Sequence, residues 1–286
     1  MAGMLYLVPT PIGNLGDISV RCREILAQAD FIAAEDTRVT LKLLNHLELK
    51  KPLVSYYEHN KASSGGKILD RIQAGEVCAL VSDAGSPAIS DPGEDLVRQC
   101  AEADIPVSAV PGPCAVITAL SISGLPTGRF TFEGFLSTAK KSRNQHLEAL
   151  RTETRTMVFY EAPHKLLATL EDMSAVFGPD RRVSLCRELT KLHEEVIRTT
   201  LGEAAQRYRQ AAPKGEFVLV LAGATPEHAP VSTLEEAAHR ALTLIEEGLS
   251  RKDAARQAAL ETAFPKMPST TPPYHSGFLP VFLPDA

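Results

Sequence analysis

The stretch VCALVSDAGSP, residues 77–87, indicates how this chain folds. Its first six residues are apolar or small, and a short run of this kind is typical of a strand buried on both faces of a parallel sheet. The residues that follow it, 83–87, have the composition of a turn. Because ligands of open α/β sheets bind outside the carboxyl ends of the strands, we expect a binding loop here.

Similar strand, loop and helix units lie on both sides of this stretch. We expect strands at 4–8, 31–34, 53–57 and 106–110, and helices at 19–29, 39–47, 64–74, 94–103 and 114–123. The regular alternation predicts a mostly parallel α/β sheet with right-handed crossovers.

The second half of the chain has a different pattern. We expect strands at 130–135, 156–160, 182–187, 195–200 and 216–222, a polar loop at 137–143, and helices from there to 151, at 165–177 and at 201–209. Two of these strands follow each other without a helix between them, so this sheet is predicted to be mixed.

The chain of 286 residues suggests about two domains. We expect an N-terminal α/β domain at 1–124 and a C-terminal α/β domain at 125–224, because residues 124–128 are rich in turn formers. A small helical segment is expected at 225–264, with a capping box at 233–236. The proline-rich residues 265–286 have no periodicity, which is typical of a disordered tail.

The overall composition excludes some classes of protein. A net charge of −5 argues against a broad nucleic-acid-binding surface, so any RNA contact must come from local basic patches. No apolar run is long enough for a membrane span, and the N-terminus resembles no export signal, so we expect a cytoplasmic protein. The five cysteines are widely spaced, and we expect no metal site and no disulfide framework.

Four loops rich in glycine and proline follow the predicted strand ends, at 9–14, 83–87, 91–93 and 111–113. Glycine allows a ligand to approach the main chain closely, although every α/β fold needs turns at these places. Neither G-x-G-x-x-G nor G-x-x-x-x-G-K-[ST] is present, which disfavours a dinucleotide or P-loop nucleotide site.

Blocks from both halves of the chain resemble the tetrapyrrole methylase superfamily. They are LYLVPTPIGNL (5–15), AEDTR (34–38), LVSDAGSP (80–87), DPG (91–93), PGPCAVITALSISGL (111–125), residues 132–135, FYEAP (159–163), CRELTK (186–191) and KGE (214–216). Within the superfamily, they are most similar to the methylases of small-subunit 16S ribosomal RNA. This resemblance implies a two-domain α/β fold, a homodimer, and S-adenosylmethionine bound in the cleft between the domains.

The implied reaction is methylation of a cytidine ribose 2′-hydroxyl in the decoding region of 16S ribosomal RNA, within the small ribosomal subunit. No metal is needed, because the sulfonium is already an activated electrophile. One alternative is a methylase of a corrin or porphyrin precursor, as in other members of the superfamily. Another is a non-catalytic module that binds the cofactor or RNA.

The resemblance also implies which residues bind the cofactor. They are Pro11, Asp83, Ala84, Gly85, Ser86, Thr118, Ala119, Phe159, Tyr160, Leu189, Gly215, Glu216 and Phe217. Some have a simpler alternative role. Asp83 is a possible helix cap, Ala119 a residue selected by helix packing, and Phe159 and Tyr160 core aromatics.

The candidate catalytic residues follow two predicted strands. Glu35 or Asp36 would accept the proton of the hydroxyl, and Arg38 would bind a phosphate or orient a carboxylate. The alternative is a surface ion-pair cluster. His59 is a further candidate base, because it titrates near neutrality, or else a structural histidine.

Candidate RNA-binding residues complete the predicted site. Tyr56 would stack on a splayed base. Arg38, and Lys140, Lys141 and Arg143 on the polar loop, would contact phosphates. A solvated run of charge is the alternative for that loop.

Overall fold

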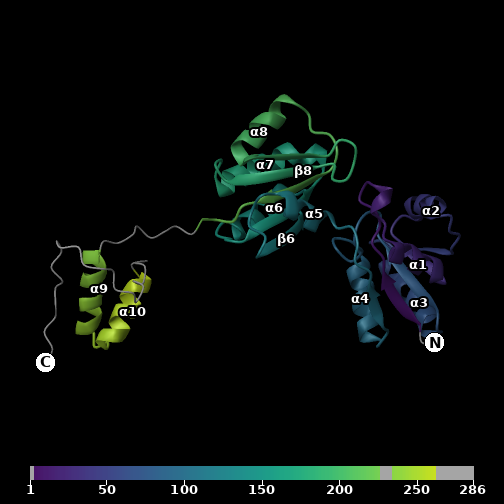
Figure 1. Ribbon diagram of the computed structural model, residues 1–286, viewed down its shortest axis with the longest axis horizontal. Coiled ribbons are helices and arrows are strands. Elements are labelled where there is room, and N and C mark those ends of the chain that lie inside the picture. The colour runs from purple at the N-terminus through teal and green to yellow at the C-terminus, as the bar shows by residue number, and fades with distance from the viewer. Residues whose placement is uncertain (1–2, 226–233, 262–286) are drawn as a thin grey trace, which may run out of the picture. The chain divides into compact units, whose positions relative to one another are not determined.

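The computed structural model describes residues 3–225 and 234–261. The chain forms two compact units, Met1–Ala224 and Thr225–Ala286. The larger unit contains two five-stranded sheets, and Figure 1 traces the chain through both. The predicted capping box at 233–236 and the proline-rich tail fall mostly or wholly outside the described residues.

The first sheet is parallel throughout, with strand order β3-β2-β4-β1-β5. Its strands are β1 (Met4–Leu7), β2 (Phe31–Ala34), β3 (Leu53–Ser55), β4 (Val77–Val81) and β5 (Val107–Ala109). All the carboxyl ends of these strands therefore lie at one edge, as the sequence predicts.

Helices cover both faces of the first sheet. Helices α1 (Val20–Gln28) and α2 (Thr37–His46) pack on one face through Leu26 and Leu44. On the other face, α3 (Lys61–Gln73) and α4 (Gly93–Glu102) pack through Ile72 and Leu96 and lie next to each other (Figure 1). The short 3-10 helix η1 (Leu15–Asp17) follows β1.

The second sheet is mixed, with strand order β6-β7-β10-β8-β9. Its strands are β6 (Phe130–Phe135), β7 (Thr156–Glu161), β8 (Arg182–Arg187), β9 (Glu195–Thr200) and β10 (Phe217–Leu221). Only β6 and β7 pair in parallel; the pairs of β10 with β7, β10 with β8, and β8 with β9 are antiparallel. The predicted mixed sheet is confirmed.

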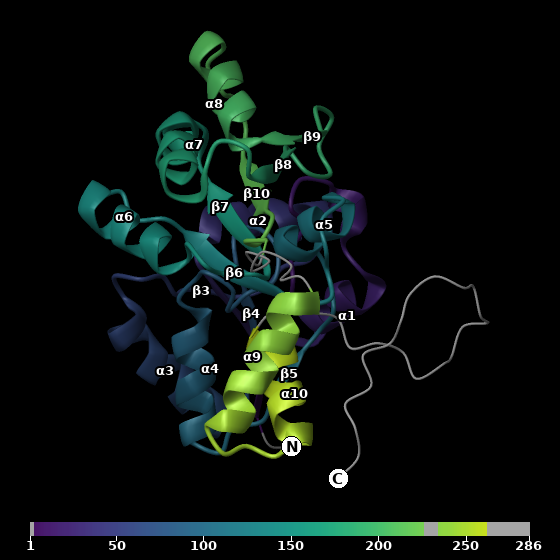
Figure 2. The ribbon, with the colours of Figure 1, turned by 90° about the vertical axis from the view of Figure 1, so that its left-hand side faces the viewer.

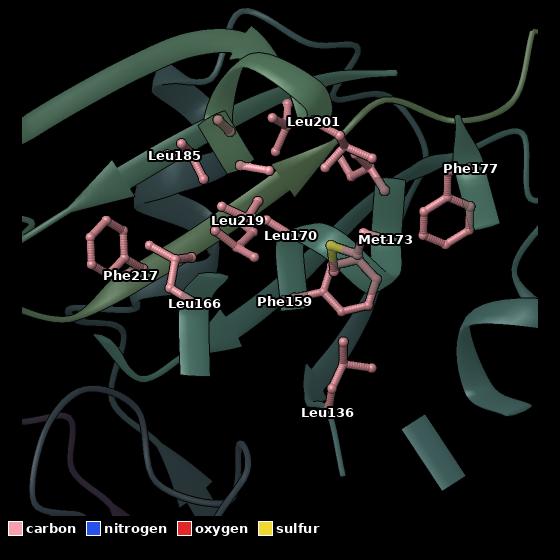
Figure 3. Packing of buried hydrophobic residues seen from close by; sticks show 14 of the residues in the cluster. Leu136, Phe159, Leu166, Leu170, Met173, Phe177, Leu185, Leu201, Phe217 and Leu219 are labelled. Atoms are coloured by element: carbon pink, nitrogen blue, oxygen red, sulfur yellow. The ribbon is translucent and has the colours of Figure 1, made fainter. Parts of the chain in front are cut away.

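The two faces of the second sheet bury different cores. One is covered by α6 (Lys140–Ala149), α7 (Pro163–Phe177) and α8 (Leu201–Gln210), with α7 beside α8 in Figure 2. The other is covered by α5 (Ala115–Ile122). Because side chains alternate along a strand, Phe159 points into the three-helix core (Figure 3), whereas Tyr160 points to the α5 side.

The smaller unit contains a helical hairpin. The helix α9 (Leu234–Glu246) and α10 (Arg251–Glu261) pack through Leu244, Ala254 and Ala258. Ser250 accepts a hydrogen bond from the Asp253 amide at 3.2 Å, so it caps α10. No helix among the described residues is long and apolar enough to cross a membrane.

The burial of Phe159 gives a stability prediction. Its side chain is fully buried among Leu136, Met173 and their neighbours. We expect Phe159→Ala to lower the free energy of unfolding by roughly 3–5 kcal/mol, because it leaves a cavity. Phe135→Ala is the control: Phe135 is 58% exposed, and its loss should cost about 1 kcal/mol or less. Urea unfolding measures both, and equal losses would contradict the assignment of Phe159 to the core.

Candidate functional site

The loops after β1 and β4 are joined by main-chain hydrogen bonds. The Thr10 amide donates to the Gly85 carbonyl at 2.9 Å, and the Gly85 amide donates to the Thr10 carbonyl at 3.0 Å. The Thr10 hydroxyl also donates to the Ser82 carbonyl at 3.1 Å. Gly85 has φ +85°, a conformation that favours glycine.

Two further bonds connect this turn to the loops after β2 and β5. The Ser86 hydroxyl donates to the Pro113 carbonyl after β5 at 3.0 Å, and the Asp83 carboxylate accepts the Asp36 amide after β2 at 3.0 Å. The 82–86 turn is therefore bonded to the loops of three other strands, and it holds the main chain of this edge in one arrangement.

The residues that follow this turn, 88–90, include two non-glycine residues with positive φ. Ala88 and Ser90 have φ +68° and +65°, which non-glycine residues rarely adopt. The Asp91 carboxylate stabilises the loop by accepting the amides of Ala88 at 2.9 Å and Gly93 at 2.7 Å. Such conformations persist where the surroundings impose them, and they cluster at functional sites.

The second sheet contributes a loop of the same character, residues 188–194, after β8. Glu188 and Thr190 have φ +51° and +66°. Lys191 is paired with Glu188 at 2.9 Å and with Glu216 at 2.8 Å, while Glu188 also accepts the Glu216 amide. These contacts join the 188–194 loop to Glu216, the residue before β10.

The loops of the two sheets meet at Gly13. A Cβ atom on Gly13 would lie 2.5 Å from Cγ of Lys191 and 3.0 Å from Oγ1 of Thr190, so only glycine fits without rearrangement. The Thr190 hydroxyl is buried and has no hydrogen-bond partner among the described residues. A buried hydroxyl without a partner is costly, which is consistent with a group reserved for a ligand.

Two neighbouring carboxylates differ in their electrostatic state. Burial, together with the charges of Asp83 and Asp91, raises the pKa of Glu35 above its ordinary value. Arg38 donates to Asp36 through both its side chain and its amide, and holds the Asp36 pKa at about 2. Asp36 also caps α2. Glu35 is therefore the better candidate base, whereas the contacts of Asp36 favour the alternative of an ion-pair cluster with Arg38.

A pocket of about 220 Å³ opens at the same edge, between the loops after β1 and β4 and the helix α2. It is lined by Thr10, Pro11, Leu15, Val39, Thr40, Lys42, Leu43, Ser82 and Asp83. Within the described residues, no group of three or more His, Cys, Asp or Glu side chains has the arrangement of a metal site.

Residues 4–205 match the family of Tetrapyrrole (Corrin/Porphyrin) Methylases. The chain belongs to this family. A relative from Synechocystis, "Ribosomal RNA small subunit methyltransferase I", is 51% identical over 92% of this chain and 95% of its own. A relative of the same name from Halalkalibacterium halodurans is 48% identical over 92% of this chain and 92% of its own. Another from Escherichia coli O157:H7 is 47% identical over 90% of both chains.

Solved structures agree on the fold. A cobalt precorrin-4 methyltransferase is 18% identical with a TM-score of 0.57, covering 76% of this chain and 94% of its own. A uroporphyrin-III C-methyltransferase from Thermus thermophilus, complexed with S-adenyl homocysteine, is 17% identical with a TM-score of 0.54, covering 76% of this chain and 97% of its own. The family and the fold class expected from the sequence are confirmed.

Several predicted cofactor residues lie where the loops meet. The main chain of Asp83, Ala84, Gly85 and Ser86 forms the turn that joins the loops, and Pro11 lines the pocket beside α2. Thr118 on α5 is half-buried, with its hydroxyl bonded to the Cys114 carbonyl. The Tyr160 ring contacts Phe132 and Phe135, and burial raises its pKa to about 12.

Other predicted cofactor residues are buried by the protein itself. The Phe159 side chain is fully buried in the three-helix core, which favours the alternative of a core aromatic. Ala119 is fully buried between α5 and the second sheet, which favours its packing role. The side chains of Leu189 and Phe217 are also buried, so these two residues can offer mainly their main chains. Glu216, by contrast, is exposed and pairs with Lys191.

Two RNA-binding predictions need correction. Tyr56 is 1% exposed and packs against α3 and α4, so its ring cannot stack on a base, whereas Tyr57 is 40% exposed. Arg143 lies in the first turns of α6, not on a loop, and pairs with the largely buried Asp172 at 2.7 Å. Lys140 and Lys141 are also on α6 but are exposed.

The remaining predicted residues are accessible. The Arg38 side chain is 85% exposed, and its guanidinium group donates hydrogen bonds to both carboxylate oxygens of Asp36. His59 is exposed, and its ring lies 6.3 Å from that of Tyr57, edge to face.

Sequence reasoning did not identify Thr10, Thr190 or the pocket beside α2. The spacing of Val39, Lys42 and Leu43 at i, i+3 and i+4 could have indicated a common helix face. Nothing in the sequence signals the left-handed conformation of Thr190, because β-branched residues are disfavoured there.

The electrostatics of Glu35 can be measured directly. Because negative charges nearby raise its pKa, Asp91→Asn should lower the Glu35 pKa toward its ordinary value. Asparagine keeps one oxygen that can accept the amides of Ala88 and Gly93. Carbon-detected NMR titration of the Glu35 carboxyl group reports the change.

Glu102→Gln is the control for this titration, because it removes a charge from the far end of α4 and should leave the Glu35 pKa unchanged. An unperturbed Glu35 pKa in the unmodified protein would contradict the account, as would an Asp91→Asn variant with no downward shift.

Proposed function

We propose that this protein transfers a methyl group from S-adenosylmethionine to a cytidine ribose 2′-hydroxyl in the decoding region of 16S ribosomal RNA. The main support for this proposal is the sequence identity of 44–51%, over about nine-tenths of the chain, with relatives named "Ribosomal RNA small subunit methyltransferase I". The raised pKa of Glu35 supports the same reaction, because a hydroxyl nucleophile requires a proton acceptor.

The residues where the two sheets meet fit this cofactor. Gly85, in its positive-φ turn, has no Cβ atom to block a ligand. The Thr190 hydroxyl has no partner within the part of the chain that the structure describes, and Tyr160 offers a half-buried ring. The main chain of 83–86, Thr118, Tyr160 and residues 215–217 would hold the cofactor. When bound, the cofactor supplies a methyl group on a positively charged sulfur.

The protein's own contribution is position and proton transfer. Glu35 would accept the proton that leaves the ribose hydroxyl, and its raised pKa makes it a stronger base than an ordinary carboxylate. Arg38, held by Asp36 at the edge of the site, would contact a phosphate of the RNA. Holding the hydroxyl in line with the methyl group supplies much of the remaining rate by orientation.

The proposal includes the partners and location predicted from the sequence. The substrate is the small ribosomal subunit, the protein acts in the cytoplasm, and two copies form a homodimer. The exposed Lys140 and Lys141 would provide a local basic contact despite the acidic net charge. The division of the larger unit at residue 124 stays a prediction, as does a role for His59.

The alternative substrate, a corrin or porphyrin precursor, is favoured by the family description and by the solved neighbours. These neighbours are less than 25% identical, so they support the fold and not the substrate. The relatives named for ribosomal RNA are much more similar, which favours RNA. The non-catalytic alternative predicts cofactor binding without transfer.

A methylation assay separates these functions. The protein, labelled S-adenosylmethionine and small ribosomal subunits that lack the modification should give label in one cytidine 2′-O-methyl group, mapped by mass spectrometry. Label in a tetrapyrrole but not in RNA, or tight cofactor binding with no transfer, would overturn the proposal.

Variants test the role of Glu35 in the same assay. We expect Glu35→Gln to lower the single-turnover rate about 10²–10⁴-fold, with the affinity for S-adenosylhomocysteine unchanged. Asp36→Asn is the matched control, because asparagine still caps α2, and its rate should fall less than tenfold. Equal losses in the two variants would contradict the assignment of Glu35 as the base.

A further inference from the structure

The pocket beside α2 contains groups that the proposed chemistry does not use. Val39, Lys42 and Leu43 reach it from one face of α2, while Pro11 and Leu15 close it from the loop after β1. Val39 and Leu15 are 38% and 45% exposed. Exposed apolar side chains that share a pocket with polar groups are typical of a binding site.

The polar groups of this pocket are available to a ligand. Lys42 belongs to none of the ion pairs found among the described residues. Asp83 uses Oδ1 to accept the Asp36 amide, and its other oxygen, Oδ2, accepts no hydrogen bond from any described residue. Thr10 and Ser82, by contrast, already donate their hydroxyl protons to main-chain carbonyls.

The size and chemistry of the pocket suit a single polar ring. Its volume of about 220 Å³ is below the roughly 300–1,000 Å³ of pockets for drug-sized ligands. Apolar walls contact the faces of a ring, and a carboxylate accepts a hydrogen bond from an amino group at its edge. Among RNA bases, cytosine combines a small ring with an exocyclic amino group, which Asp and Glu side chains recognise.

We propose that this pocket binds the cytosine base of the nucleotide that is methylated. The Asp83 carboxylate accepts from the cytosine N4 amino group, Pro11, Leu15 and Val39 enclose the ring, and the Lys42 ammonium group pairs with an RNA phosphate. This inference rests on the proposed function, and it deepens it by assigning the group that selects the base.

The position of Asp83 connects base recognition with the reaction. The same carboxylate lines the pocket and is one of the charges that raise the Glu35 pKa. The pocket and Glu35 therefore lie at the same edge of the first sheet. Single-stranded RNA is commonly read in this way, with a splayed base bound along its hydrogen-bonding edge.

Filling the pocket tests the proposal. Val39→Trp places a large ring among the lining residues, and we expect the kcat/KM for small ribosomal subunits to fall at least tenfold. Leu41→Trp is the matched control: Leu41 is 50% exposed on the same helix but does not line the pocket, and its kcat/KM should stay within twofold. Thermal unfolding and calorimetric titration with S-adenosylhomocysteine should show both variants folded and equally able to bind.

A substrate change tests base selection in the unmodified protein. Replacing the target cytidine by uridine puts a carbonyl oxygen against Asp83, and the rate should fall at least tenfold. In Asp83→Asn, whose amide can donate to that carbonyl, the cytidine-to-uridine rate ratio should shrink. This ratio is informative even if the variant is slower overall.

The outcomes separate this inference from the function on which it rests. If RNA is methylated at the ribose but Val39→Trp behaves like Leu41→Trp, or cytidine and uridine react equally, the pocket assignment is wrong and the proposed function stands. If the unmodified protein methylates no RNA, both are overturned.

Discussion

The paired hydrogen bonds between Thr10 and Gly85 are the constraint on which the site depends. A parallel sheet brings the carboxyl ends of its strands to one edge, but it does not fix the loops that follow them. Here the two main-chain bonds connect the loops after β1 and β4, and Asp83 and Ser86 extend the connection to the loops after β2 and β5. A site held in advance loses little entropy when it binds a ligand.

This arrangement also shifts the pKa values of two neighbouring carboxylates, Glu35 and Asp36, in opposite directions. Asp36 is paired with Arg38 and caps α2, which keeps it ionised far below neutral pH. Glu35 points into a partly buried region that it shares with the charges of Asp83 and Asp91, so its proton is held more tightly. Environments that separate the pKa values of adjacent acids are a common way to assign a base.

The sequence predicted the type of both sheets because the strands alternate with helices in one half and follow each other directly in the other. It also predicted the loops that follow the strand ends, since glycine and proline mark them. It could not distinguish Phe159 from Tyr160, because adjacent strand residues face opposite sides and the choice depends on which helices cover each side. The partner of Arg143 lies 29 residues away on α7, so the sequence alone could not show that this arginine is used structurally.

The central claim is that the main chain of residues 83–86, together with the 188–194 loop, holds the cofactor, while the pocket beside α2, which shares Ser82 and Asp83 with the turn, holds a different group. A crystal structure of the protein with S-adenosylhomocysteine tests this most directly. The account predicts that the ligand contacts the main chain of residues 83–86 and the hydroxyl of Thr190, with the pocket lined by Val39 and Lys42 left free. A ligand bound in that pocket, or away from the 82–86 turn, would contradict it.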